Sequence, residues 1–236
     1  MTSHPAPSAP IPFEEYRQHT RRLPALRYGL HWCAHHLTNW YSVLGSLSIL
    51  LAVIFYFADT GNRTMQRHYQ AWQVINTAQG KGGSGGRIDA LQQLNKDKVS
   101  LVGVDVEGAF LQAIRLDGAK LRRANFHNAD LRNASFVSAD LSDTNLSGSN
   151  LRNSELHLAR MEGANLNDAD LEEANLSDVD LSGADLEGAD LRGADLHNLN
   201  WKEITSVKMT NLSRVKNAPD GFMEWALKNG AVQPNQ

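Results

Sequence analysis

The sequence of 236 residues has a single cysteine, Cys33, which excludes a disulfide framework and a four-thiolate metal site. Aromatic residues make up only 7% of the chain, so aliphatic side chains must do most of the packing. Neither sign of charge dominates: the 23 Lys+Arg and 26 Asp+Glu give a net charge of −3, which excludes a generally cationic nucleic-acid-binding protein. The informative features are therefore patterns along the chain.

A long stretch without charged residues lies between Arg27 and Asp59. Within it, residues 39–58 read NWYSVLGSLSILLAVIFYFA, and as a helix they would be about 30 Å long, which matches the hydrocarbon core of a bilayer. Aromatic residues stand at both ends of this run, as they do at membrane interfaces. The run predicts one transmembrane helix. A cleaved signal peptide or a buried soluble helix fits less well, because 38 residues precede the run and it is uniformly apolar.

Residues 1–38 are interpreted as a disordered N-terminal tail and a juxtamembrane segment, since four prolines occur among the first twelve residues. His31, Cys33 and His35 have the residue types of a metal or lipid-modification site, but the aromatic residues between and around them favour an amphipathic helix resting at the membrane interface. We predict no metal and no cofactor. Three arginines before the span and two after it leave the membrane side of the remaining chain undecided.

From Leu101 to Trp201 every fifth residue is apolar, which makes 21 consecutive positions in one register. Two residues before each stands a small or aliphatic residue, most often alanine, and the residue between them is most often Asp or Asn. A helix would spread these apolar residues around its surface, and a straight strand would place them alternately on both sides. Only a chain that turns a corner about every five residues points all of them inward, which predicts a solenoid.

The A-(D/N)-L-x-x pattern, as in Ala184–Gly188 and Ala189–Gly193, resembles the pentapeptide-repeat family, and its membrane-anchored cyanobacterial members in particular. The resemblance implies a mainly β fold: a right-handed quadrilateral parallel β-helix with four pentapeptides per coil. It also implies a single-pass protein of the bacterial inner membrane or the thylakoid. Polar residues in the alanine column and an arginine in the Asp/Asn column predict a slightly irregular middle coil; they are Thr144, Ser149, Ser154 and Arg160.

Both open ends of a solenoid expose apolar core and therefore need caps. Phe222 and Trp225 lie on one face of a predicted C-terminal helix, and they are candidates for end-cap contacts or for contacts between copies in an oligomer. The predicted domains are the tail and juxtamembrane segment 1–38, the transmembrane helix 39–58, the helical linker and N-terminal cap 59–98, the repeat β-helix 99–205 and the C-terminal helical cap 206–236.

Acidic residues concentrate in the second half of the repeats. Residues 162–201 contain eleven acidic residues and only one basic residue, Arg192. This predicts an acidic face that docks onto a basic protein surface, although acidic residues also serve solubility. The candidate residues are Asp170, Asp180, Asp185, Asp190 and Asp195.

The leading hypothesis is a single-pass membrane protein, with the lipid bilayer as one partner, that presents a rigid acidic rod as a structural or protein-interaction module. We predict no enzyme, because an interior of leucine and alanine leaves no concave site with convergent polar groups. The negative charge disfavours direct nucleic-acid binding. Two alternatives stay open: a DNA-mimic regulator of a type II topoisomerase, which the family resemblance implies, and a juxtamembrane metal- or lipid-modified sensor.

Overall fold

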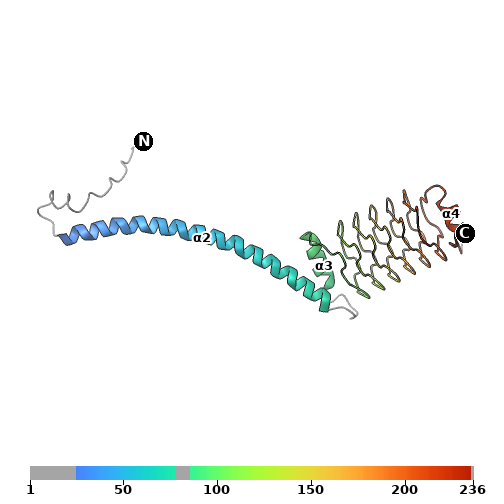
Figure 1. Cartoon of the computed structure of the whole chain (residues 1–236), viewed down its shortest axis with the longest axis horizontal. Coiled ribbons are helices and arrows are strands. Elements are labelled where there is room, and N and C mark those ends of the chain that lie inside the picture. Colours follow the sequence, from blue (N-terminus) through green and yellow to red (C-terminus); the bar gives the residue numbers. More distant parts are fainter. Residues whose placement is uncertain (1–24, 78–85, 235–236) are drawn as a thin grey trace. The chain divides into compact units, whose positions relative to one another are not determined.

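The computed structural model describes residues 25–77 and 86–234, and within the first range it describes the side chains of residues 47–56 and 61–77. The chain divides into two compact units, Met1–Met65 and Gln66–Gln236. Helix α2 (Ala25–Thr77) begins in the first unit and ends in the second. Helices α3 (Arg87–Lys96) and α4 (Phe222–Lys228) lie at opposite ends of a stack of coils in the second unit (Figure 1).

The predicted transmembrane segment lies within α2. Its described side chains, residues 47–56, are all exposed. Among the residues that the structure describes, no helix is both long and apolar enough to cross a membrane. Residues 1–24 of the predicted tail, and the side chains of His31, Cys33 and His35, lie outside the described part of the chain. The exposed large apolar residues of this segment are Leu47, Ile49, Leu50, Leu51, Val53, Ile54, Phe55 and Tyr56.

The coils repeat every twenty residues. Parallel bridges join Asp105 to Asn125, Phe110 to Asp130 and so on to the pair of Asp180 and Asn200, always twenty residues apart. Each coil therefore contains four five-residue repeats and has four faces, as the sequence predicts. Within the described residues each face contributes one bridged residue per coil, and no longer strand forms. The solenoid is thus a parallel β-helix by its pairing, with faces too short for regular strands; its handedness stays a prediction.

The chain turns each corner through a residue with positive φ. Gly118 has a φ of 62°, and the Ala119 N–H donates to the Leu116 carbonyl oxygen over 3.1 Å. This is the geometry of a type II turn, whose third residue is most easily glycine or asparagine. Leu158 holds the same position with a φ of 61°, where a bulky side chain costs about 1–2 kcal/mol. Each repeat thus consists of a turn, closed by a hydrogen bond between residues three positions apart, and a short extended segment that forms one face. Together they give the period of five.

The interior is a continuous aliphatic column. We call the apolar residues at every fifth position the register residues, and those from Leu101 to Leu196 are at most 1% exposed. Two of them, Phe126 and Phe136, pack edge to face with ring centres 5.9 Å apart. The Thr144 and Ser149 hydroxyls donate to carbonyl oxygens three residues earlier, over 2.6 and 2.7 Å. Bridges in this region keep the twenty-residue spacing. The prediction of an irregular middle coil was therefore wrong. The hydroxyls of Thr144 and Ser149 bond within their own turn, and Ser154 keeps the same coil spacing although its buried hydroxyl has no hydrogen-bond partner among the described residues.

The repeat continues beyond the predicted boundary at residue 205. One extra residue forms a bulge: the Thr205 N–H donates to the Ala184 oxygen over 2.8 Å, and the Ser206 oxygen accepts from the Leu186 N–H over 3.0 Å. Two residues of one coil thus oppose one of the previous coil, as in a β-bulge. After the bulge the bridges span twenty-one residues and continue without interruption to Lys216; beyond α4, one more bridge joins Asn211 to Val232. The coils therefore extend about ten residues into the predicted C-terminal cap.

Helical segments cover both ends of the solenoid. At the N-terminal end, Ile75 of α2 and Leu91 and Leu94 of α3 belong to the same hydrophobic core as the first coil. A contact of 2.8 Å between His68 Nε2 and Asp97 Oδ2 joins α2 to the end of α3. At the other end, Phe222 and Ala226 of α4 are buried against the last coil.

Candidate functional site

One face of the solenoid carries an aromatic residue where the next coils carry polar ones. Phe110 points outward and is 54% exposed, so it takes no part in the packing of the interior. The bridged residues of the same column in the following coils are Asp130, Asn150, Asp170, Asp190 and Asn211.

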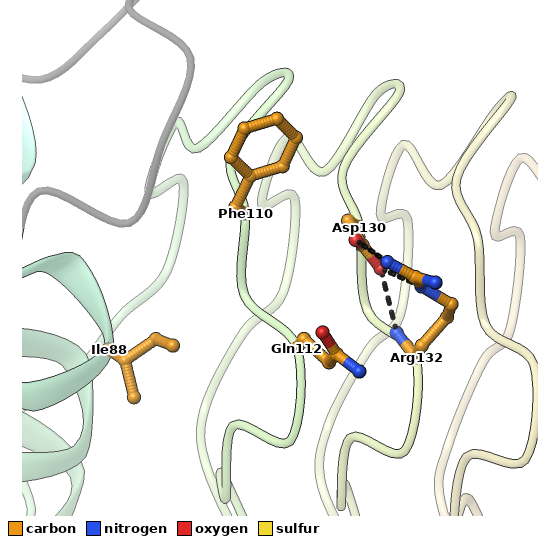
Figure 2. A pocket seen from close by; sticks show the side chains of 5 residues that line it. All are labelled: Ile88, Phe110, Gln112, Asp130 and Arg132. Carbon is orange, nitrogen blue, oxygen red and sulfur yellow. Dashed lines mark hydrogen bonds and ion pairs between the residues drawn. The ribbon is translucent and has the colours of Figure 1, made fainter.

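A shallow pocket of about 550 Å³ lies beside Phe110, and we call it the Phe110 pocket. Ile88 of α3 forms one wall, Phe110 and Gln112 come from one coil, and Asp130 and Arg132 come from the next (Figure 2). The burial of neighbouring α3 residues against the first coil holds Ile88 opposite Phe110. The pocket therefore has an apolar side next to the cap and a polar side on the second coil.

The polar side is an ion pair within one repeat. Arg132 Nε donates to Asp130 Oδ1 over 2.8 Å, and Arg132 Nη2 donates to Asp130 Oδ2 over 2.6 Å. The hydrogen bonds from Arg132 hold the pKa of Asp130 below its usual value, although partial burial opposes them, and the same bonds raise the pKa of Arg132. Both side chains are therefore charged at neutral pH, and each cancels the charge of the other.

Two lining residues have hydrogen-bonding groups to spare. The Gln112 amide bonds to no residue in the described part of the chain, so it can both donate and accept. Arg132 uses its Nε and Nη2 groups in the ion pair with Asp130, whereas its Nη1 group bonds to no residue in the described part of the chain. These groups match the needs of a peptide unit, which offers one donor and one acceptor.

The five predicted acidic residues do not form one face. Asp170 and Asp190 are bridged across neighbouring coils, whereas Asp180, Asp185 and Asp195 lie on the three other faces. Successive repeats occupy successive faces, so only residues one coil apart share a face. The prediction of a single acidic face made of these five residues was therefore wrong.

Arginines neutralise the face that Asp170 and Asp190 share. Arg192 contacts Asp190 at 2.8 Å and Glu172 at 3.1 Å, and Arg152 contacts Glu172 at 2.5 Å and Asp170 at 3.5 Å. This face is a ladder of alternating charges, and its carboxylates are already paired.

The face of Asp185 is the one without lysine or arginine in the coils before the bulge. Its repeats up to Gly188 contain no lysine or arginine, and only the coil after the bulge adds a cation, Lys208. Asparagines form a ladder along it: Asn145 Nδ2 donates to Asn125 Oδ1 over 3.2 Å, and Asn125 Nδ2 donates to Asp105 Oδ1 over 3.0 Å. We call this surface the Asp185 face; its carboxylates are Asp105, Glu107, Asp168, Asp185 and Glu187.

The two predicted C-terminal residues lie in one aromatic cluster with Trp201. The ring centre of Trp201 is 5.7 Å from that of Phe222 and 5.1 Å from that of Trp225. Phe222 is 1% exposed, and Trp225 is half-buried. Both residues thus serve the end cap, and a contact between copies at this end stays a prediction.

Comparisons with known proteins show the family of the chain. A family model described as "Pentapeptide repeat region" matches residues 109–186. A pentapeptide-repeat protein of the Arabidopsis thaliana thylakoid lumen is 32% identical over 44% of this chain and 71% of its own length, with a TM-score of 0.34. The chain belongs to the pentapeptide-repeat family. Its membrane-anchored subtype stays a prediction.

Two further solved structures are similar to part of the chain, the first of them also described as a pentapeptide-repeat protein. Rfr23 of the cyanobacterium Cyanothece 51142 is 34% identical over 45% of this chain and 64% of its own, with a TM-score of 0.29. QnrB1, a plasmid-mediated fluoroquinolone resistance protein, is 16% identical over 58% of this chain and 78% of its own, with a TM-score of 0.34. No curated protein matches the chain.

The Phe110 pocket was not predicted from the sequence, although the pentapeptide pattern contains a signal for it. Phe110 is the one aromatic residue at the position before a register residue between 105 and 200, where Asp or Asn is usual. Ile88 gives no comparable signal, because its place beside Phe110 depends on how α3 packs on the first coil.

Proposed function

We propose that this pentapeptide-repeat protein is a non-catalytic interaction module whose outer faces bind another protein. The observation that carries the proposal is the sealed aliphatic interior, which leaves the outward side chains as the chemically active part of the solenoid. Backbone bonds between coils and side-chain ladders hold these outward groups in fixed positions. Because the groups are already ordered, a partner that binds them loses little conformational entropy in the module.

The Asp185 face is the surface best suited to the basic partner that the sequence predicts. It combines five carboxylates with uncharged asparagines over successive coils. An excess of charge of one sign steers an oppositely charged protein toward the surface and fixes its orientation. The Asp170 face has as many carboxylates, but arginines and Lys216 pair with them.

Partner capture by cross-linking of the full-length chain in its native membranes or extract tests this role. One variant removes three carboxylates of the Asp185 face: Asp168→Asn, Asp185→Asn and Glu187→Gln. A matched control makes the same three kinds of change on the face of Asp180: Asp140→Asn, Asp180→Asn and Glu162→Gln. We expect the wild type and the control to recover the same protein, and the Asp185-face variant to recover roughly tenfold less. Equal recovery by all three chains, or recovery by none, contradicts the proposal.

We further propose that a lipid bilayer covers the apolar part of α2 and anchors the module. Ten consecutive exposed residues, 47–56, reach around the whole circumference of a helix, since each residue advances it by 100°. Eight of them are large and apolar, which supports an apolar environment on every side.

Alkaline carbonate extraction followed by density-gradient flotation tests the anchor and separates membranes from aggregates. We expect the wild type to stay with floating membranes, and Leu50→Lys with Ile54→Lys to be extracted, since each lysine costs about 2.5–3.5 kcal/mol at the centre of a span. The control places lysines at two other exposed apolar sites, Met209→Lys and Leu227→Lys, and should float with the wild type. Extraction of the wild type contradicts the anchor.

The other hypotheses have less support. A DNA-mimic regulator of a topoisomerase needs a continuous negative surface, whereas arginines pair with Asp170 and Asp190. A juxtamembrane sensor built on His31, Cys33 and His35 depends on side chains outside the described residues.

A further inference from the structure

The Phe110 pocket differs from the rest of the solenoid surface in its chemistry. The outward groups of the neighbouring coils in this column are carboxylates and amides, whereas Phe110 presents an exposed ring opposite Ile88. Figure 2 shows Ile88 on α3, Phe110 and Gln112 on the neighbouring coil, and the Asp130–Arg132 ion pair on the coil after it, with Gln112 between Ile88 and the ion pair. An apolar side chain placed there would contact both of them.

The charges around this pocket indicate an uncharged ligand. Asp130 and Arg132 are the charged residues that line it, and their two-point pairing leaves no net charge. A charged ligand group would lose hydration without gaining an unpaired counter-charge. A peptide unit loses less, because the Gln112 amide and Arg132 Nη1 can replace its hydrogen bonds to water.

The volume agrees with such a ligand. A pocket of about 550 Å³ is within the range of sites that hold small molecules, and it exceeds the needs of one large side chain with its adjoining peptide units. It is open on one side, so an extended segment can enter and leave along the surface of the coil. The matching occupant is a short stretch of a partner chain.

We propose that the Phe110 pocket binds a peptide segment of a partner protein through one large, uncharged apolar side chain. This side chain packs between Ile88 and Phe110, and Gln112 and Arg132 hold the adjoining peptide group. The inference rests on the proposed role as an interaction module and names a second surface, apart from the Asp185 face. The two surfaces recognise different chemistry: one selects positive charge, and the other selects an apolar residue.

Photolabelling of the full-length chain with N-acetyl-p-benzoylphenylalaninamide tests the pocket directly. We expect the label to map by mass spectrometry to peptides that contain Ile88, Phe110 or Gln112. N-acetyltryptophanamide should compete with it, and N-acetyllysinamide should not. Phe110→Asn should reduce the labelling roughly tenfold, the effect of about 1.4 kcal/mol of lost contact. Asparagine already occupies this column at position 150, so the variant retains the pattern of the coil.

Val102→Asn is the matched control, because Val102 is an exposed apolar residue of similar exposure outside the pocket. It should be labelled at the pocket like the wild type. Equal labelling of Phe110→Asn and the wild type, label at other sites only, or competition by the lysine derivative overturns the proposal. Absence of label from the wild type overturns it too, including the case in which another segment of the same chain fills the pocket. None of these results depends on capture through the Asp185 face, so the two proposals fail separately.

Discussion

Leu156→Asp is expected to abolish cooperative unfolding of the solenoid, whereas Leu158→Asp, two residues away, should leave it intact. Leu156 is 0% exposed and lies in the middle of the aliphatic column. A carboxylate there would be buried without a partner, among the most destabilising changes known for a folded protein. Because each coil contacts only its neighbours, the break would separate the two halves of the stack. Urea unfolding followed by circular dichroism measures the result.

Leu158 provides the control because it tests the same substitution on the outside of the same repeat. It is 52% exposed, and its φ of 61° suits aspartate better than leucine. We expect Leu158→Asp to change the free energy of unfolding by less than about 0.5 kcal/mol. Leu156→Ala should lie between the two, with a loss of about 2–5 kcal/mol. Similar unfolding curves for the two aspartate variants would contradict the inward register.

The architecture was predictable because it depends on a strictly local rule. If every fifth residue must point inward, the chain has to turn once in each repeat. The third residue of that turn has a positive φ, which explains why glycine, asparagine and aspartate so often stand two positions after a register leucine. Thr144 and Ser149 could not be read correctly from the pattern, because their fit depends on hydrogen bonds to the carbonyl groups of Leu141 and Leu146.

The surface was harder to predict because it depends on which residues meet across coils. Asp170 and Asp180 are close in sequence and equally acidic, yet they lie on different faces. Their surroundings also differ: Arg152 contacts Asp170, while Asp180 accepts hydrogen bonds from Ser182 and Asn200. Grouping residues that are twenty positions apart in the sequence recovers the four faces. The partners of the long arginine side chains, however, depend on the folded surface.

The end of the repeat was misplaced for a related reason. The pattern loses its register after Trp201, and the sequence alone makes this appear as the end of the coils. The structure instead absorbs one residue at Thr205 as a bulge and continues with Val207 and Leu212 as buried register residues. A single inserted residue disrupts the bridge pairing at one position. This costs less free energy than exposing the apolar end of a coil to water.

Phe222→Ala is expected to release α4 and destabilise the last coil by about 3–5 kcal/mol. Phe222 is 1% exposed and packs against Trp201, the last residue of the regular five-residue series. A helix of seven residues does not form without tertiary contacts, so loss of this anchor removes the cap and not only one side chain. Leu227→Ala, on the same helix at 43% exposure, should cost much less. Thermal unfolding followed by circular dichroism measures the result, and tryptophan fluorescence adds a signal to which Trp201 and Trp225 contribute two of the chain's five tryptophans.

The same experiment distinguishes an end cap from a contact between copies. A cap residue acts within one chain, so the destabilisation by Phe222→Ala should be the same at every protein concentration. A residue that joins two copies would make the unfolding temperature of the wild type rise with concentration, and the substitution would remove that dependence. Because Phe222 is already buried within its own chain, we expect Phe222→Ala to leave the concentration dependence of the unfolding temperature unchanged. A concentration-dependent effect would assign Phe222 to an oligomer interface and leave the closing of the last coil to Trp201 and Ala226.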